Sequence, residues 1–282
     1  GGLARRMAAR AGLPLAIQTT LDRRAALSGA DFVVTQLRVG GLAARVLDER
    51  IPLDYGVLGQ ETVGPGGFAK ALRTVPVLLA IARDIEALCP DAWLINFTNP
   101  AGLVTEAVLR HSRVKCIGLC NVPINMVMTA AKLLGAESRD VVIDFAGLNH
   151  LVWGMRVRLR GEDVTAGILE KLADGAALTM NNIPDLKWDP AFLRDLAMVP
   201  SPYHRYYYMT GRILTEEQAA AAPSGPGTRA EQVQAVEEAL FARYRDENLA
   251  EKPPELAARG GAYYSEAAVS LISAIAGDTG DL

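Results

Sequence analysis

Apolar runs of strand length alternate with helical patterns along the first half of the chain. The run 31–37 is continuous, as in a strand that is buried on both faces of a parallel sheet, and further strands are predicted at 93–98 and 114–119. Helical spacing of apolar residues is found at 41–49, 68–88, 101–110 and 124–134. The alternation predicts parallel β-α-β units with right-handed crossovers, in a doubly wound sheet of the α/β class.

Glycine, proline and capping residues delimit the shorter elements near the start. A helical pattern over 1–12 closes at a glycine, a short strand is expected at 15–19, and Asp22 is placed to cap a brief helix that ends near residue 29. The segment 55–67 is rich in glycine, so we expect it to lack regular structure.

The pattern changes near residue 140. Two consecutive strands are expected at 141–147 and 151–159, interrupted at Asn149 and His150. Helical patterns follow at 165–172, 190–196, 214–222, 228–245 and 263–276. We therefore expect a first domain over 1–140 with a Rossmann-type parallel sheet, and a mainly helical α+β domain over 141–282.

Composition narrows the classes of function. The chain has 282 residues, half of them hydrophobic, and a formal net charge of −3 with scattered Lys and Arg, which disfavours nucleic acid or an anionic membrane as the main partner. No apolar run approaches the roughly 20 residues of a membrane span. Three cysteines do not form a disulfide framework, which favours the reducing cytoplasm. Both ends of the chain look cut, so we expect an internal fragment.

Polar side chains follow the predicted parallel strands at the point where each strand ends. Arg38 follows the first strand, Asn99 the second, and Cys120 with Asn121 the third. Ligands of doubly wound sheets bind beyond the carboxyl ends of the strands. These residues therefore mark one edge of the predicted sheet as a candidate site.

Cys120 and His150 carry donor atoms suited to a divalent transition metal. Two protein ligands are too few for a closed structural zinc site, but they leave coordination positions for substrate and water. The alternative is equally simple: a lone cysteine at a strand end is usually a small buried hydrophobic residue, and a lone histidine usually a hydrogen-bonding one. Spacing alone leaves both interpretations open.

Other candidates have similar alternatives. The amide of Asn99 could contact a ligand hydroxyl, although Asn-Pro often only ends a strand. Arg38 and Arg229 could bind a phosphate or carboxylate, although exposed arginines are commonly only solvated. Four tyrosines fall within 203–208, and such clusters more often pack in a core than act in catalysis.

Taken together, the motifs resemble glycoside hydrolase family 4, the NAD- and manganese-dependent glycosidases that do not use a pair of carboxylates. The resemblance rests on an ordered set of short motifs: Arg38-Val-Gly-Gly41, Gly59-Gln-Glu-Thr62, Ile95-Asn-Phe-Thr-Asn-Pro100, Gly118-Leu-Cys-Asn-Val-Pro123, Gly147-Leu-Asn-His150 and Pro202-Tyr203 before Arg205. It spans the whole chain. Within the family the chain looks most like the 6-phospho-β-glucosidases, and the implied fold resembles lactate and malate dehydrogenases.

The resemblance implies roles for individual residues. Cys120 and His150 would bind Mn²⁺ or another divalent metal, and Tyr203 would be the base that removes the proton on sugar carbon 2. Substrate contacts are expected from Arg38, Asn99, Asn121, Asn149 and Arg229, and cofactor contacts from Asn99 and Glu61. The implied chemistry is oxidation at carbon 3 with NAD, elimination of the carbon 1 leaving group, water addition and re-reduction.

Two departures from the family pattern qualify these expectations. Members that act on α-linked substrates carry an acid after the metal cysteine, whereas this chain has Asn121, which favours an aryl 6-phospho-β-glucoside or phosphorylated disaccharide with a β linkage. The glycine loop that binds the nucleotide and the C-terminal region are missing, which leaves open whether this polypeptide alone binds NAD. A homo-oligomer, dimer or tetramer, is expected. The rival interpretations are an NAD-dependent 2-hydroxy-acid dehydrogenase and a non-catalytic sugar-phosphate or nucleotide sensor.

Overall fold

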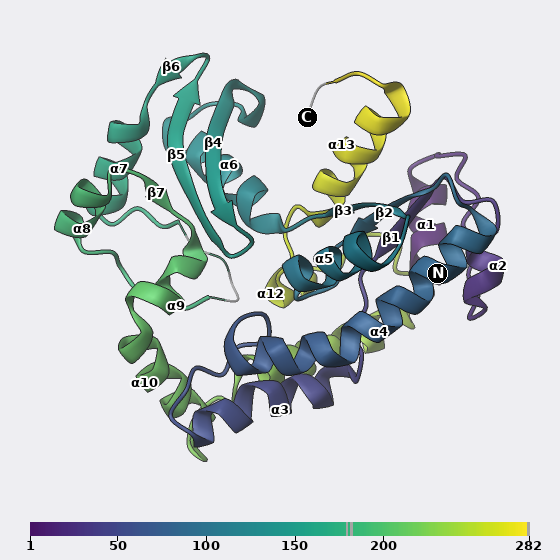
Figure 1. Ribbon diagram of the computed structural model, residues 1–282, viewed down its shortest axis with the longest axis horizontal. Helices are drawn as coiled ribbons and strands as arrows, with labels where there is room; N and C mark the ends of the chain where they lie inside the picture. Colours follow the sequence, from purple (N-terminus) through teal and green to yellow (C-terminus); the bar gives the residue numbers. More distant parts are fainter. Residues whose placement is uncertain (179, 181–182, 281–282) are drawn as a thin grey trace. The chain divides into compact units, whose positions relative to one another are not determined.

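The computed structural model describes residues 1–178, 180 and 183–280, which form two compact units (Figure 1). Unit 1 comprises Gly1–Ile117 and Glu217–Gly260, and unit 2 comprises Gly118–Glu216 and Gly261–Leu282. Each unit therefore contains chain from both sides of residue 140. None of the helices formed by the described residues combines the length and apolar character needed to cross a membrane.

Unit 1 is built on a three-stranded sheet in the order β1-β2-β3. Its strands are β1 (Phe32–Thr35), β2 (Trp93–Asn96) and β3 (Lys115–Gly118). β1 and β2 run parallel, with Phe32 opposite Trp93 and Thr35 opposite Asn96. The intervening helices are α3 (Gly41–Asp54), α4 (Gly64–Leu88) and α5 (Ala101–His111). The predicted α/β class with a parallel sheet is confirmed.

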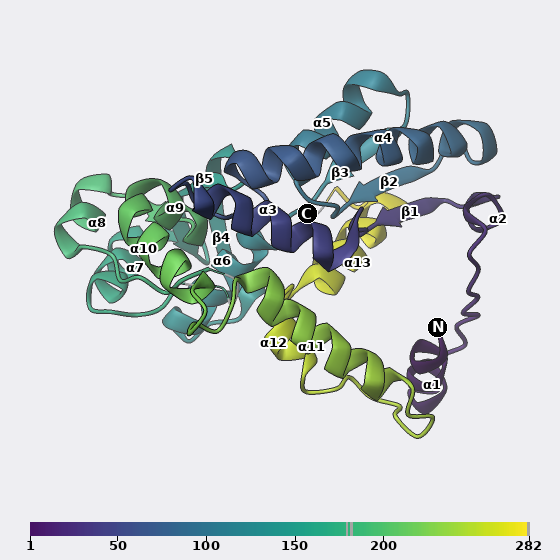
Figure 2. The same cartoon turned by 90° about the horizontal axis from the view of Figure 1, so that it is seen from below.

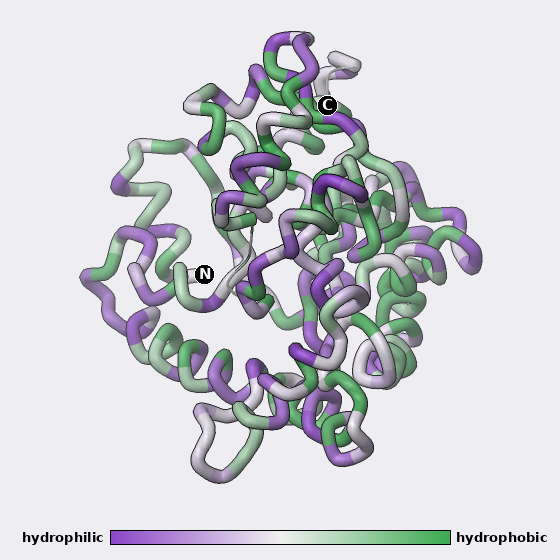
Figure 3. The backbone as a smooth tube through the Cα atoms, turned by 90° about the vertical axis from the view of Figure 1, so that its left-hand side faces the viewer, coloured by the Kyte–Doolittle hydropathy of each residue, from purple (hydrophilic) through white to green (hydrophobic). Residues whose placement is uncertain are grey.

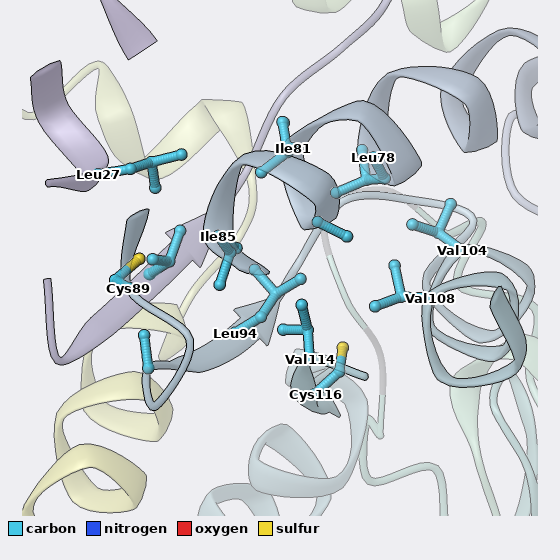
Figure 4. Close-up of a cluster of buried hydrophobic side chains, with 13 residues drawn as sticks. Leu27, Leu78, Ile81, Ile85, Cys89, Leu94, Val104, Val108, Val114 and Cys116 are labelled. Atoms are coloured by element: carbon cyan, nitrogen blue, oxygen red, sulfur yellow. The ribbon is translucent and has the colours of Figure 1, made fainter. Parts of the chain in front are cut away.

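The core of unit 1 lies between this sheet and two helices (Figure 4). Apolar residues at helical spacing on α4, among them Leu78, Ile81 and Ile85, meet Leu94 of β2 and Val104 of α5. Burial of such side chains is the main favourable term in folding. Two of the three cysteines, at positions 89 and 116, are free thiols inside this core, so they serve as packing residues.

Further helices complete unit 1. They are α1 (Gly2–Arg10), α2 (Arg23–Leu27), α11 (Arg229–Tyr244) and α12 (Leu256–Arg259). Asp22 caps α2 as predicted, because its side chain accepts from the backbone N–H groups of Arg24 and Ala25. α12 lies beside α11 (Figure 2). Hydrophobic and hydrophilic residues interleave along the helices, as expected where each helix buries one face (Figure 3).

Unit 2 combines a small antiparallel sheet with helices. Its strands are β4 (Val141–Leu148), β5 (Leu151–Leu159), β6 (Glu162–Asp163) and β7 (Val199–Pro200). β5 pairs with the other three strands. The helices are α6 (Asn121–Leu134), α7 (Thr165–Ala173), α8 (Pro190–Leu196), α9 (Arg205–Tyr208) and α13 (Tyr264–Gly277). α10 (Thr210–Ala221) runs from unit 2 into unit 1, and 3₁₀ turns cover Ser138–Asp140 and Pro202–His204.

Three predicted boundaries are wrong. The segment 15–19 forms no strand; it is mostly exposed, and the Ile17 carbonyl accepts from Arg5 Nε at 2.8 Å instead of from a neighbouring strand. The end of the glycine-rich segment is the first turn of α4, where the missing N–H of Pro65 is tolerated. α6 begins at Asn121 and not at residue 124, so Cys120 is its N-cap residue.

Candidate functional site

His150 lies in the tight turn between β4 and β5. The strand register places Leu148 opposite Leu151, so the turn consists of Asn149 and His150. His150 has a φ of 62°, in the left-handed region where few non-glycine residues occur. The residue is nonetheless only 4 % exposed. The hairpin therefore directs the imidazole into unit 2 and not into solvent.

Cys120 meets His150 at the N-terminus of α6. Its Sγ lies 3.5 Å from His150 Nε2. Burial raises the pKa of the Cys120 thiol, while hydrogen bonds from the Val122 backbone, the Asn149 side chain and the Asn121 backbone oppose that rise. The sulfur thus faces hydrogen-bonding groups of the helix N-terminus and the hairpin turn, which favour a thiolate when a cation is present.

The separation of the two donor atoms fits a shared metal ion. Bonds of about 2.3 Å to sulfur and about 2.1 Å to nitrogen at a tetrahedral angle place the donors about 3.6 Å apart. Across the described residues, no group of three His, Cys, Asp or Glu side chains gathers to hold a metal. Cys120 and His150 could therefore be two ligands of an ion whose other positions are open to substrate and water.

Tyr203 completes this group of side chains in unit 2. It sits in the 3₁₀ turn Pro202–His204 and is 5 % exposed. Its ring lies flat on the His150 imidazole, with centroids 3.6 Å apart and an interplanar angle of 6°. Tyr206 also packs against the Tyr203 ring, tilted by 44° with a centroid distance of 5.7 Å. The predicted metal ligands and the predicted base therefore adjoin one another.

Arg205, which belongs to a family motif but to which the sequence assigned no role, secures the helix that follows Tyr203. Its buried guanidinium donates to the carbonyls of Leu186 at 2.8 Å and Leu178 at 3.1 Å, and it stacks on Trp188. These bonds tie the segment before α8 to α9. A buried arginine whose donors satisfy backbone carbonyls fixes both segments at once. An arginine within a run of tyrosines gave no sequence signal for this role.

Asn121 and Asn149 differ in their surroundings. Asn149 contacts Cys120 through a side-chain hydrogen bond. Asn121 is 5 % exposed, and its Nδ2 donates to the Ala262 carbonyl at 3.1 Å, just before α13. That bond uses one donor of the amide that was predicted to contact substrate. A role of Asn121 in substrate binding stays a prediction.

In unit 1, Glu61 is the centre of a buried group of charges. Its carboxylate meets Lys70 Nζ at 2.8 Å, Arg45 at 3.4 Å and the Arg38 guanidinium. Burial alone would raise the pKa of the Glu61 carboxyl, but the charges of Arg45, Lys70 and Arg38 outweigh it and hold the pKa well below its usual range. Arg45 also pairs with Glu49 at 2.7 Å, so three cations meet two carboxylates and leave one positive charge in excess, which suits a phosphate. The sequence did not indicate that Lys70 and Arg45 contribute to this group, because both lie inside helices and not at a strand end.

The remaining candidates of unit 1 have structural partners. Asn99 Oδ1 accepts from the Ala101 N–H at 3.3 Å, at the start of α5. Arg229 opens α11 and donates to the Ala258 carbonyl at 3.1 Å. The fully buried Asn96, not predicted as special, bonds Thr35, Thr98 and Thr105 at the end of β2. Ligand contacts of Asn99 and Arg229 stay predictions.

The chain matches known proteins over its whole length. The model of "Family 4 glycosyl hydrolase" matches residues 1–136, and that of the "Family 4 glycosyl hydrolase C-terminal domain" matches 145–282. A probable 6-phospho-beta-glucosidase of Bacillus subtilis is 56% identical, over 100% of this chain and 64% of its own length. A 6-phospho-beta-glucosidase of Escherichia coli is 49% identical, over 98% of this chain and 62% of its own length.

A solved structure shows the same fold. The 6-phospho-beta glucosidase of Thermotoga maritima, crystallised with manganese, NAD⁺ and glucose-6-phosphate, aligns with a TM-score of 0.84 at 35% identity. The alignment covers 96% of this chain and 61% of that one. The chain thus spans a little over three fifths of the length of these relatives. Both family models, the sequence identities and the shared fold agree, and the chain belongs to glycosyl hydrolase family 4.

Proposed function

We propose that this protein is a 6-phospho-β-glucosidase that uses NAD and Mn²⁺. Support comes from the relatives of that name, which are 56% and 49% identical over nearly the whole chain. The observation in the structure that carries the proposal is the meeting of Cys120, His150 and Tyr203 in unit 2. An aryl 6-phospho-β-glucoside or a phosphorylated disaccharide is the proposed substrate.

Cys120 and His150 would hold the Mn²⁺, which supplies Lewis-acid stabilisation of negative charge on the sugar oxygens when bound. The Asn149 side chain, bonded to Cys120, would orient the sulfur, as outer partners orient metal ligands in general. The left-handed backbone at His150 presents the imidazole to the same point. These residues define where the sugar hydroxyls on carbons 2 and 3 would be held.

Tyr203 would take the proton from sugar carbon 2 at its phenolic oxygen. Its ring is held parallel to the His150 imidazole, so the base and the metal ligand keep a fixed relation. Burial excludes bulk water from the ring, which protects a reactive sugar intermediate from side reactions. NAD would supply the hydride acceptor at carbon 3. No pair of carboxylates is required for this route.

Arg38, Glu61 and Lys70 would serve the anionic parts of the ligands. Glu61 holds the Arg38 guanidinium in a charge-assisted bond, so the arginine is oriented before a phosphate arrives. Arg229, at the start of α11, would add a second contact to the 6-phosphate. Asn99 and Glu61 would contact the cofactor, and Asn121 the substrate.

The test is an assay of the full-length protein with p-nitrophenyl 6-phospho-β-glucoside, with and without NAD⁺ and Mn²⁺. We expect cleavage only when both are present. Cleavage that ignores NAD⁺ would overturn the proposed mechanism. The α-linked isomer is the matched control, and it should react much more slowly. The variant Cys120→Ser separates the hydroxy-acid dehydrogenase from the glycosidase, because only the glycosidase depends on the metal.

We infer further that the protein works in the cytoplasm as a homo-oligomer. Free cysteines among the described residues support a reducing compartment. Analytical ultracentrifugation of the full-length protein would report the assembly, and a monomer at micromolar concentration would refute this part of the proposal.

A further inference from the structure

Unit 2 contains a group of polar atoms that are buried and lack a hydrogen-bond partner among the described residues. They are Trp153 Nε1, Ser201 Oγ, and both ring nitrogens of His204. Ser201 and His204 are each 0 % exposed. Buried polar atoms without a partner are rare in folded proteins, because each one loses its bond to water. Trp153, Ser201 and His204 are called the buried polar cluster below.

The three residues belong to one place in unit 2. β5 and β7 pair so that Trp153 lies opposite Pro200, the residue before Ser201. The backbone N–H of His204 donates to the Ser201 carbonyl at 3.0 Å. The rings of Trp153 and His204 lie 4.5 Å apart, at an angle of 41°. The cluster thus joins strand β5 to the short turn that carries Tyr203.

The donors and acceptors of the cluster complement those of water. An indole N–H only donates, a hydroxyl donates and accepts, and a neutral imidazole has one donor and one acceptor. Burial lowers the pKa of His204 to about 4, so its ring is neutral at pH 7. That ring packs against Trp153 in a tilted contact and against Tyr208 in an edge contact, and both neighbours are aromatic rings. Buried water typically makes about three such bonds.

We propose that Trp153, Ser201 and His204 bind internal water behind Tyr203, and that this hydrated cluster positions the Tyr203 ring on His150. Ser201 directly precedes the 3₁₀ turn of Tyr203, and His204 is the last residue of that turn. Water bonded to both would fix the turn to β5 without any contact to the substrate. His204 and Ser201 are therefore positioning residues for Tyr203. The consequence for catalysis rests on the proposed function, whereas the water site does not.

A crystal structure at a resolution that shows ordered water tests the site itself. We expect water bonded to at least two of the four atoms in the wild type, and its loss in His204→Phe, which keeps a ring and removes both nitrogens. Tyr208→Phe is the matched control, because it leaves the ring that packs on His204 and should retain the water. A direct bond between Ser201 Oγ and His204, with no water, would overturn the proposal.

Kinetics tests the positioning. His204→Phe should lower kcat at least about tenfold with little change in KM, because a small displacement of a catalytic group is costly. It should also raise the deuterium isotope effect for substrate labelled at carbon 2, since proton removal becomes slower. His204→Asn, which returns polar atoms, should recover part of kcat. An unchanged isotope effect in a folded His204→Phe would refute the positioning role.

The crystal structure and the activity assay distinguish the proposed water site from the proposed function. A wild-type protein with ordered water in the cluster but no NAD- and Mn²⁺-dependent cleavage would refute the proposed function and leave the water site standing. An active wild type whose buried polar cluster contains no water would refute the water site and leave the proposed function standing.

Discussion

The imidazole of His150 lies flat on the phenol ring of Tyr203, with centroids 3.6 Å apart and the planes 6° from parallel. One ring belongs to the β4–β5 turn and the other to the 3₁₀ turn after β7. β5 pairs with both β4 and β7, so one strand holds the two turns in place. The stack couples a proposed metal ligand to the proposed base.

Replacing Tyr203 by Phe should separate chemistry from structure. The phenyl ring keeps the stack on His150, so folding and Mn²⁺ affinity should stay near wild type. Loss of the proton acceptor should lower kcat roughly 10²- to 10⁴-fold. Steady-state kinetics and a metal titration measure the two effects. Tyr207→Phe, at a half-exposed ring, is the control, and a similar loss there would argue against a special role for Tyr203.

Cys120→Ser should weaken metal binding, because a hydroxyl is a poorer ligand than a thiolate for a transition metal. Even the loss of an outer partner typically costs 10- to 100-fold in affinity, so we expect a drop of at least about tenfold. Isothermal titration with Mn²⁺ gives the dissociation constant. Cys89→Ser, in the core of unit 1, should leave Mn²⁺ affinity unchanged. Equal affinities for wild type and Cys120→Ser would contradict the assigned ligand.

Glu61→Gln should destabilise unit 1. It leaves Arg38 and Lys70 in a largely buried place without their anion, while Arg45 keeps its pair with Glu49. Breaking a buried ion pair typically costs about 3–5 kcal/mol. Urea unfolding measures the change in free energy. Glu251→Gln, which breaks an exposed pair with Arg10, should cost about 1 kcal/mol or less. Equal costs at the two sites would mean that the charges around Glu61 are solvated.

Glu217 should make stability fall as pH rises towards neutrality. Burial raises the pKa of its carboxyl to about 7, although the Gly59 N–H donates to it at 2.8 Å. Between about pH 4.3 and pH 7 the folded state keeps a proton that the unfolded state has lost, so unfolding becomes easier with rising pH. The free energy of unfolding should drop by about 3 kcal/mol across this window, and Glu217→Gln should remove that part. An identical pH profile for the variant would refute the assignment.

Asn121→Asp should loosen the chain before α13. A carboxylate cannot donate to the Ala262 carbonyl, which Asn121 Nδ2 reaches at 3.1 Å. The loss of this bond should cost about 1 kcal/mol. Hydrogen exchange of the amides of 262–265 should become faster, while the amides of β4 and β5 serve as the internal control. Unchanged exchange at 262–265 would show that the bond contributes nothing to that segment.

Local patterns sufficed for most of the fold. The apolar runs around Val33, Leu94 and Cys116 became β1, β2 and β3, although only β2 is buried on both faces, and Val34 of β1 and Lys115 of β3 are exposed. The predicted strand at 15–19 failed because a strand needs a partner, and a single sequence does not show one. The start of α4 was missed because glycine is a poor helix former, yet Gly66 and Gly67 lie so close to neighbouring backbone that a Cβ would clash.

By itself the sequence determined the α/β class, the family and the identity of the residues that could bind a metal. Those conclusions depend on residue types and their order along the chain. Only the tertiary structure decided that Cys120 Sγ comes within 3.5 Å of His150 Nε2, that Tyr203 stacks on that imidazole, and that Glu61 gathers three cations. These are contacts between residues far apart in the chain, and strand pairing, helix packing and turn geometry set them together.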